Sequence, residues 1–105
     1  FDLIKIMSLG ADIVNGARSF MLSMGCIQAK ECNKNTCPVG IATQNRDLIN
    51  GLDPNEKKVR VFNYHKALIK EVIEVMGAMG VDKTSDLKPS HINIRKNDTI
   101  TSYKA

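Results

Sequence analysis

The chain has 105 residues, a hydrophobic fraction of 43% and a formal net charge of +4. This length allows one domain at most and excludes a closed (β/α)8 barrel within the chain, since that fold typically needs about 250 residues. The mild basic charge does not indicate nucleic-acid binding, because acids and bases are interspersed and only 5% of the residues are aromatic. A solvated helical surface accounts for the charge, and a docking face for an acidic partner is the alternative.

The sequence has no stretch near the roughly 18 apolar residues of a membrane span, and it has no secretory leader. We therefore expect a soluble, cytoplasmic protein with no membrane partner. Because the chain begins at Phe1 rather than at Met, we also expect it to be a piece of a longer protein.

The N-terminal segment predicts a helix followed by a strand. Residues 2–9 place their apolar side chains close to one helical face, and Gly10 stands where glycine commonly ends a helix. Residues 11–15 are β-branched in the middle and precede Gly16, which predicts a single buried strand. Since one strand is not stable alone, it would pair with a sheet outside this chain or with a second copy.

The turn after this strand contains Gly16, Ala17 and Arg18. Small residues at the end of a strand leave backbone N–H groups free to meet a phosphate, and the guanidinium of Arg18 suits a phosphate or a carboxylate. An ordinary turn into the apolar helical segment at residues 20–24 explains the same residues.

All three cysteines lie within a short segment, at Cys26, Cys32 and Cys37. Turn-forming residues around the last two predict a loop that wraps its backbone around a small object and directs N–H groups at it. Three close thiols followed by Pro38 favour an iron–sulfur cluster, either a three-iron cluster or a four-iron cluster with one other ligand. Inert thiols and a disulfide or redox pair remain open alternatives.

One long helix is predicted in the C-terminal half. Asp53 can cap its start, and Pro54 fits the first helical position. Apolar residues then recur in steps of three and four for about 26 residues, until Gly80. The resulting apolar face needs a barrel wall or a partner copy to cover it.

The remaining segments carry weaker signals. Residues 39–50 predict an ordered loop that covers the cluster, and residues 82–92 predict one or two short turns. The polar residues 93–105 predict a tail that frays. A zinc site would need a fourth ligand beside the cysteines, for which only His65 and His91 are available as imidazoles.

Several of these segments closely resemble the glutamate synthase family, and more narrowly its FMN-binding, glutamate synthase-like members. The most specific marker is the cysteine segment, with GCIQA at residues 25–29 and CPVGIATQ at residues 37–44. About nine-tenths of the chain is covered, because the resemblance continues in four further motifs. These are LGADIVNGAR (9–18), GLD (51–53), RVFNYH (60–65) and SDLKPSHI (85–92).

The resemblance implies that the intact protein is an α/β barrel of the (β/α)8 type with an inserted cluster, most simply 3Fe-4S, held by Cys26, Cys32 and Cys37. Barrels of this family bind the FMN phosphate at the turns after their last two strands. Gly16, Ala17 and Arg18 are thereby the candidates for that phosphate, although many relatives have a Gly-Arg or Gly-Thr pair here. The implied segments are the last part of the FMN barrel (1–24), the cluster segment with its covering loop (25–50), a C-terminal helical extension (51–92) and the polar tail (93–105).

By the same resemblance, the intact protein would be an oxidoreductase of glutamate biosynthesis that reductively aminates 2-oxoglutarate, with electrons passing through the cluster to FMN. Its partners would be the rest of the barrel, an electron donor such as a ferredoxin or a reductase subunit, and optionally a second copy. The chain alone is expected to be mainly α with at most one or two short strands, to contain no catalytic residue and to be inactive. Two alternatives are a metal-free helical interaction or oligomerisation fragment and an FMN oxidoreductase acting on a different substrate.

Overall fold

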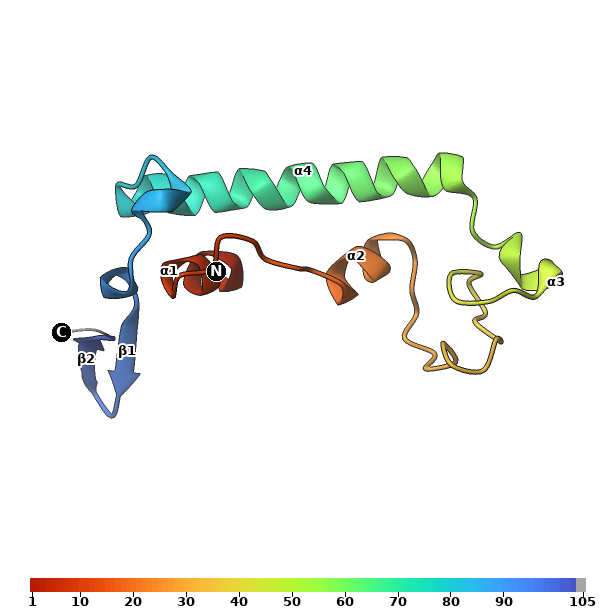
Figure 1. Ribbon diagram of the computed structural model, residues 1–105, viewed down its shortest axis with the longest axis horizontal. Helices are drawn as coiled ribbons and strands as arrows, with labels where there is room; N and C mark the ends of the chain where they lie inside the picture. The colour runs from red at the N-terminus through yellow and green to blue at the C-terminus, as the bar shows by residue number, and fades with distance from the viewer. Residues whose placement is uncertain (104–105) are drawn as a thin grey trace. The chain divides into compact units, whose positions relative to one another are not determined.

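The computed structural model describes residues 1–103, and it is mainly helical with two short strands (Figure 1). This confirms the fold class predicted for the chain. The helices are α1 (Asp2–Ser8), α2 (Arg18–Ser23), α3 (Arg46–Ile49) and α4 (Pro54–Met79), followed by the 3-10 turns η1 (Thr84–Asp86) and η2 (Pro89–His91) and the strands β1 (Asn93–Lys96) and β2 (Thr99–Ser102).

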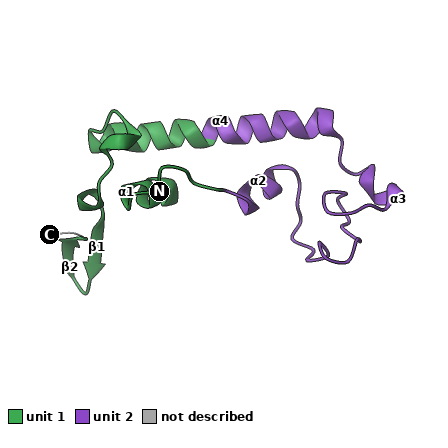
Figure 2. Ribbon diagram, in the orientation of Figure 1, with its two compact units in different colours: residues 1–15, 68–105 green, residues 16–67 purple. Residues whose placement is uncertain are grey.

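The chain forms two compact units (Figure 2). Unit 1 contains residues 1–15 and 68–105, and unit 2 contains residues 16–67. Helix α4 begins in unit 2 and ends in unit 1. None of the helices in the described part of the chain is both long and apolar enough to cross a membrane.

Glycines end α1 and α4 in the same way. At the end of α1, Gly10 has φ +112°, its N–H donates to Met7 O at 3.0 Å, and the next N–H, of Ala11, donates to Ile6 O at 3.3 Å. At the end of α4, Gly80 has φ +74°, and the following N–H donates to Met76 O at 2.9 Å. These paired bonds satisfy carbonyls that the helices leave free, and they end each helix.

The start of α4 follows the sequence prediction. The Asp53 carboxylate accepts the N–H of Asn55 at 3.0 Å, and Pro54 is the first helical residue. The helix has 26 residues, as the periodicity of its apolar residues predicts. Part of its apolar surface stays exposed in the described structure, at Val59, Phe62, Ile69 and Ile73.

Unit 1 has an apolar core. Its buried members come from α1, the end of α4 and the following turns, and they are Ile4, Met76, Val81 and Leu87. Partly buried Met7, Val72, Val75 and Met79 pack against them. Burial of these side chains is the main stabilising interaction of this unit.

The predicted strand at residues 11–15 is wrong. This segment has no regular secondary structure, and the Ile13 side chain is 83% exposed. The reason is physical: a strand needs a neighbour to accept its ladder hydrogen bonds, and the described residues contain no strand that pairs with it.

The predicted frayed tail is also wrong over most of its length. Residues 93–102 form an antiparallel hairpin in which Asn93 pairs with Ser102 and Lys96 with Thr99. Asn97 starts the turn with φ +54°, a left-handed conformation that asparagine tolerates well. Residues 104–105 of the predicted tail lie outside the described residues.

Candidate functional site

The three cysteines line one small cavity in unit 2. The cavity measures about 30 Å³, and its wall is formed by Cys26, Cys32 and Cys37 with residues 27–31 and 38–39. All three thiols are free, with Cys26 partly exposed, Cys32 exposed and Cys37 buried. The structure therefore brings together the three residues that the sequence singles out as ligands, around a cavity on the order of two water molecules in size.

Cys26 is positioned by the end of α2. Gly25 has φ +97°, its N–H donates to Leu22 O at 3.0 Å, and the Cys26 N–H donates to Met21 O at 3.1 Å. This glycine-dependent helix end turns the chain out of α2 at the first cysteine. Helix α2 itself is held by Phe20, whose ring meets Tyr64 of α4 edge-on at a centroid distance of 5.1 Å.

The backbone between the cysteines adopts unusual conformations. Gln28, Lys30 and Asn35 all have φ near +60°, a region that non-glycine residues seldom enter. The first of these conformations lets the Gln28 N–H approach Cys26 Sγ at 3.4 Å. The loop thus directs a backbone donor at a sulfur atom, as expected for a segment that supports a thiolate.

Side-chain hydrogen bonds close the loop that carries Cys32. The Glu31 carboxylate accepts Thr36 Oγ1 at 2.8 Å and Lys34 Nζ at 3.3 Å. Asn35 connects the loop to the segment that follows Cys37, because its backbone O accepts Thr43 Oγ1 at 2.7 Å and its Oδ1 accepts the Gln44 N–H. These bonds hold the loop in place, since the loop has no buried apolar core of its own.

Cys37 is 8% exposed and lies at the centre of this segment. The N–H of Ala42 lowers the pKa of the Cys37 thiol below its ordinary value, and the N–H groups of Val39, Ile41 and Gly40 act in the same direction. Burial of the thiol opposes the effect. These donors stabilise negative charge on the sulfur and so make the thiolate easier to form.

Two glycines allow the loop to pack against α3. Gly40 has φ +80°, and a β-carbon at this position would collide with the backbone O of Leu48. A β-carbon on Gly51 would lie 3.0 Å from Val39 O. Asn45 caps α3 by accepting the Asp47 N–H at 2.9 Å. The short helix α3 thus lies within the segment that the sequence predicts as a loop.

The donor set fits an iron–sulfur cluster in its chemistry. It combines three free cysteines around one cavity with backbone N–H groups directed at two of the sulfur atoms. In residues 1–103 no group of three or more Cys, His, Asp or Glu side chains is close enough to hold a single metal ion. An iron–sulfur cluster does not require the three sulfur atoms to meet at one ion, because each thiolate binds a different iron atom.

The histidines considered for zinc are engaged elsewhere. The His65 ring lies against Phe20 at a centroid distance of 5.5 Å, and His91 Nδ1 accepts the Lys88 N–H at 3.1 Å. Neither histidine lines the cysteine cavity. Both have the structural contacts that are usual for a histidine on a helix or in a turn.

The predicted phosphate candidates lie at the start of α2. Gly16, Ala17 and Arg18 are all exposed, and Ala17 is the N-cap residue without a side-chain cap. The Arg18 side chain has no hydrogen bond or ion pair within residues 1–103. Their role in FMN binding stays a prediction.

Two cations near the cysteines were not found from the sequence. Lys57 and Arg60 of α4 lie against Gly25, the residue before Cys26. They are separated from it by about thirty positions in the chain, so no local motif could indicate this contact.

Comparison with known proteins matches residues 1–82 to a family described as the conserved region in glutamate synthase. A glutamate synthase large subunit-like protein, YerD, of Bacillus subtilis is 40% identical over 88% of this chain and 18% of its own length. An archaeal glutamate synthase [NADPH] of Methanocaldococcus jannaschii is 35% identical over 90% of the chain and 18% of its own length.

No solved structure matches the chain significantly. The chain spans less than a fifth of the length of these two relatives, so the match concerns one region of a much larger protein. The family match includes the whole cysteine segment and all of α4, and it confirms the resemblance noted in the sequence. The chain belongs to the glutamate synthase family.

Proposed function

We propose that this chain is the cluster-binding part of an FMN and iron–sulfur oxidoreductase of the glutamate synthase type. The observation that supports it best is the convergence of Cys26, Cys32 and Cys37 on one cavity. In this proposal the three thiolates hold a 3Fe-4S cluster, which supplies one-electron transfer when bound. The cavity is small, so the loop between the cysteines would open when the cluster is inserted.

The residues around the cavity have defined roles in this proposal. The N–H groups near Cys37 and the Gln28 N–H stabilise negative charge on the sulfur ligands. Glu31 and Asn35 hold the loop in its observed conformation through their hydrogen bonds to Thr36 and Thr43. These contacts position the ligands and tune their electronic properties, while the redox chemistry belongs to the cofactors.

The proposed activity of the whole protein is reductive amination of 2-oxoglutarate to glutamate. The rest of the longer protein would supply the barrel, most of the flavin site and the substrate site, and a ferredoxin or a reductase subunit would supply electrons. Arg18, which is exposed, would contact the FMN phosphate together with Gly16 and Ala17. A cytoplasmic location is part of the proposal, since free thiols persist in a reducing compartment.

The test is the iron and acid-labile sulfide content of the full-length protein, purified without oxygen. We expect both in a ratio near three to four, and we expect Cys32→Ala to lose both together. Ile27→Ala is the matched control, because Ile27 lines the same cavity but carries no ligand atom. A colourless protein with three free thiols would overturn the proposal and favour a metal-free interaction module, and stoichiometric zinc would overturn it as well.

The substrate is tested separately. Turnover of 2-oxoglutarate and ammonia by the full-length protein, with a chemical reductant as electron source, would support glutamate formation. A protein that contains both cofactors but does not turn over these substrates would be an FMN oxidoreductase with a different substrate.

A further inference from the structure

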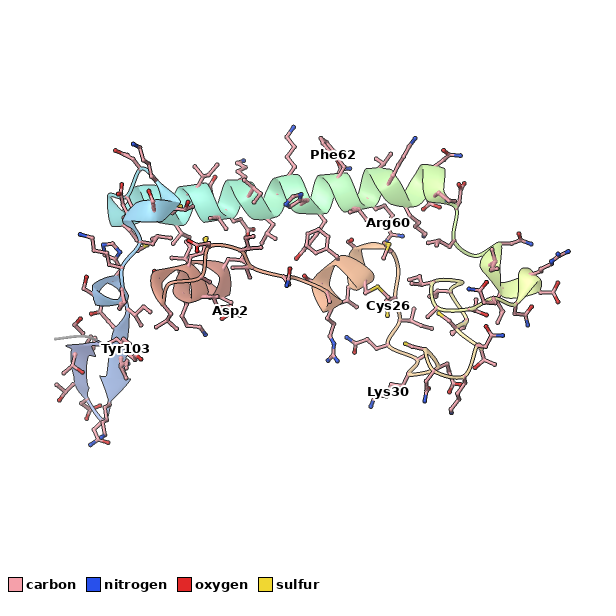
Figure 3. All side chains as sticks on the ribbon, viewed as in Figure 1. Asp2, Cys26, Lys30, Arg60, Phe62 and Tyr103 are labelled. Carbon is pink, nitrogen blue, oxygen red and sulfur yellow. The ribbon has the colours of Figure 1, made fainter. Side chains whose placement is uncertain are left out.

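Two cationic side chains of α4 lie on the backbone where the cysteine segment begins. A β-carbon built on Gly25 would lie 3.5 Å from Lys57 Nζ and 3.6 Å from Arg60 Nη1. Gly25 directly precedes Cys26, and all four residues belong to unit 2. Figure 3 shows Arg60 on the side of α4 that faces the segment with Cys26.

Gly25 places the backbone of the cysteine segment within contact distance of both cations. A β-carbon at this position would make ordinary van der Waals contact with the ammonium and guanidinium groups, so the cations themselves do not require a glycine here. The glycine is required by its positive φ, which ends α2 directly before Cys26.

The net charge at this place is positive. Glu56 is the carboxylate shared by both cations, at 3.7 Å from Lys57 Nζ and 4.0 Å from Arg60 Nη1. Two positive charges against one negative charge leave one positive charge uncompensated. The Lys57 side chain is only 15% exposed, so water screens its charge less than that of an ordinary surface lysine.

We infer that Lys57 and Arg60 raise the reduction potential of the cluster held by Cys26, Cys32 and Cys37, and this inference rests on the proposed function. Reduction adds one electron from an external one-electron donor to the cluster and makes its charge more negative by one unit. No bond is formed or broken, and no proton is transferred. A nearby uncompensated positive charge stabilises the more negative product, which shifts the potential upward.

The test is the midpoint potential of the cluster in the full-length protein, measured by electron paramagnetic resonance during titration with dithionite. We expect Lys57→Gln and Arg60→Gln each to shift the potential to a more negative value, and the double variant to shift it further. Arg60→Lys keeps the charge and should restore most of the original potential. Lys66→Gln is the control, since Lys66 lies on the same helix but over the Phe62 ring, 5.9 Å from its centroid.

A potential that is unchanged in Lys57→Gln and Arg60→Gln, with the iron content of the wild type, would overturn this inference and leave the proposed function intact. A wild-type protein without iron would overturn both. If Lys57→Gln lowers the iron content, the decision rests on Arg60→Gln, because the Arg60 side chain is 46% exposed and is easier to replace without disturbing the fold.

Discussion

Units 1 and 2 are stabilised by different interactions. Unit 1 has an apolar core in which Met76 and Val81 are buried against Ile4. In unit 2 the buried apolar residue is a cysteine, Cys37, and the surrounding chain is fixed by glycines, left-handed residues and side-chain hydrogen bonds. Unit 1 is therefore stabilised by its own apolar packing, whereas the loop of unit 2 depends on backbone conformation and polar contacts, and it is this loop that we propose to bind the cluster.

A substitution in the core of unit 1 should lower stability and leave iron binding intact. A substitution that distorts the loop of unit 2 should remove iron. Both are measured in the full-length protein to which we propose that the chain belongs.

The largest effect is expected for Gly40→Ala. The new β-carbon would collide with the Leu48 backbone O, and alanine is strained at φ +80°. We expect loss of iron and a destabilisation of roughly 2–5 kcal/mol. Gly77→Ala is the matched control, because nothing lies within 4 Å of its new β-carbon. Alanine is also more favourable than glycine in a helix interior by about 1 kcal/mol. Iron content and thermal unfolding measure both variants, and an iron-replete Gly40→Ala protein would contradict the prediction.

A second large effect is expected for Met76→Ala in unit 1. Met76 is buried in the apolar core, so its truncation should cost roughly 2–5 kcal/mol, measured by denaturant unfolding. Met76→Leu keeps the volume and should cost less than about 1.5 kcal/mol. Iron content should stay at the wild-type value in both variants. If Met76→Ala lost as much iron as Gly40→Ala, the distinction between the two units would fail.

Local sequence signals predict α1 and α4 well, whereas α3 lies in a segment predicted as a loop. The capping signal at Asp53 and Pro54, the periodic apolar residues and the terminal Gly80 gave the full extent of α4, and the segment at residues 2–9 gave α1. The start and end of each of these helices depend on a few neighbouring residues, and the length depends on one repeating apolar pattern. The strand at residues 11–15 could not be judged in this way, because a strand depends on partners that the local sequence does not reveal.

The hairpin at residues 93–102 was missed for a different reason. Its two-residue turn at Asn97 and Asp98 was present in the sequence, but the overall polarity of the segment concealed the short strands on either side. At the candidate site, cysteine spacing predicted the shared cavity. The proximity of Lys57 and Arg60 to Gly25 arises only when α4 packs beside the cysteine segment, so the linear sequence does not show it.

A smaller effect is expected for Asp53→Ala at the start of α4. The Asp53 carboxylate accepts the Asn55 N–H, and loss of such a cap costs about 1 kcal/mol. We expect amide hydrogen exchange in the first turn of α4 to become about fivefold faster. Asp53→Asn keeps an acceptor and should leave the exchange rate close to that of the wild type. Equal exchange in Asp53→Ala and wild type would show that the cap does not stabilise this turn.

The smallest effect is a pH dependence that arises from Cys37 in iron-free protein. Backbone N–H groups lower the pKa of this thiol, whereas in the unfolded chain a cysteine has a pKa of about 8.5. Between the two values the unfolded state binds more protons, so the stability contributed by the thiolate increases with pH. It is complete above the unfolded pKa and is lost as pH falls through the folded pKa.

We therefore expect the difference in Tm between the wild type and Cys37→Ser to grow as pH rises toward about 9. The same difference for Ile27→Ala should not change with pH, because Ile27 does not titrate. Parallel curves for the wild type and Cys37→Ser would mean that the N–H groups do not stabilise a thiolate in the folded protein. Unit 2 would then lack the feature that most clearly separates it from unit 1, a buried centre prepared for negative charge.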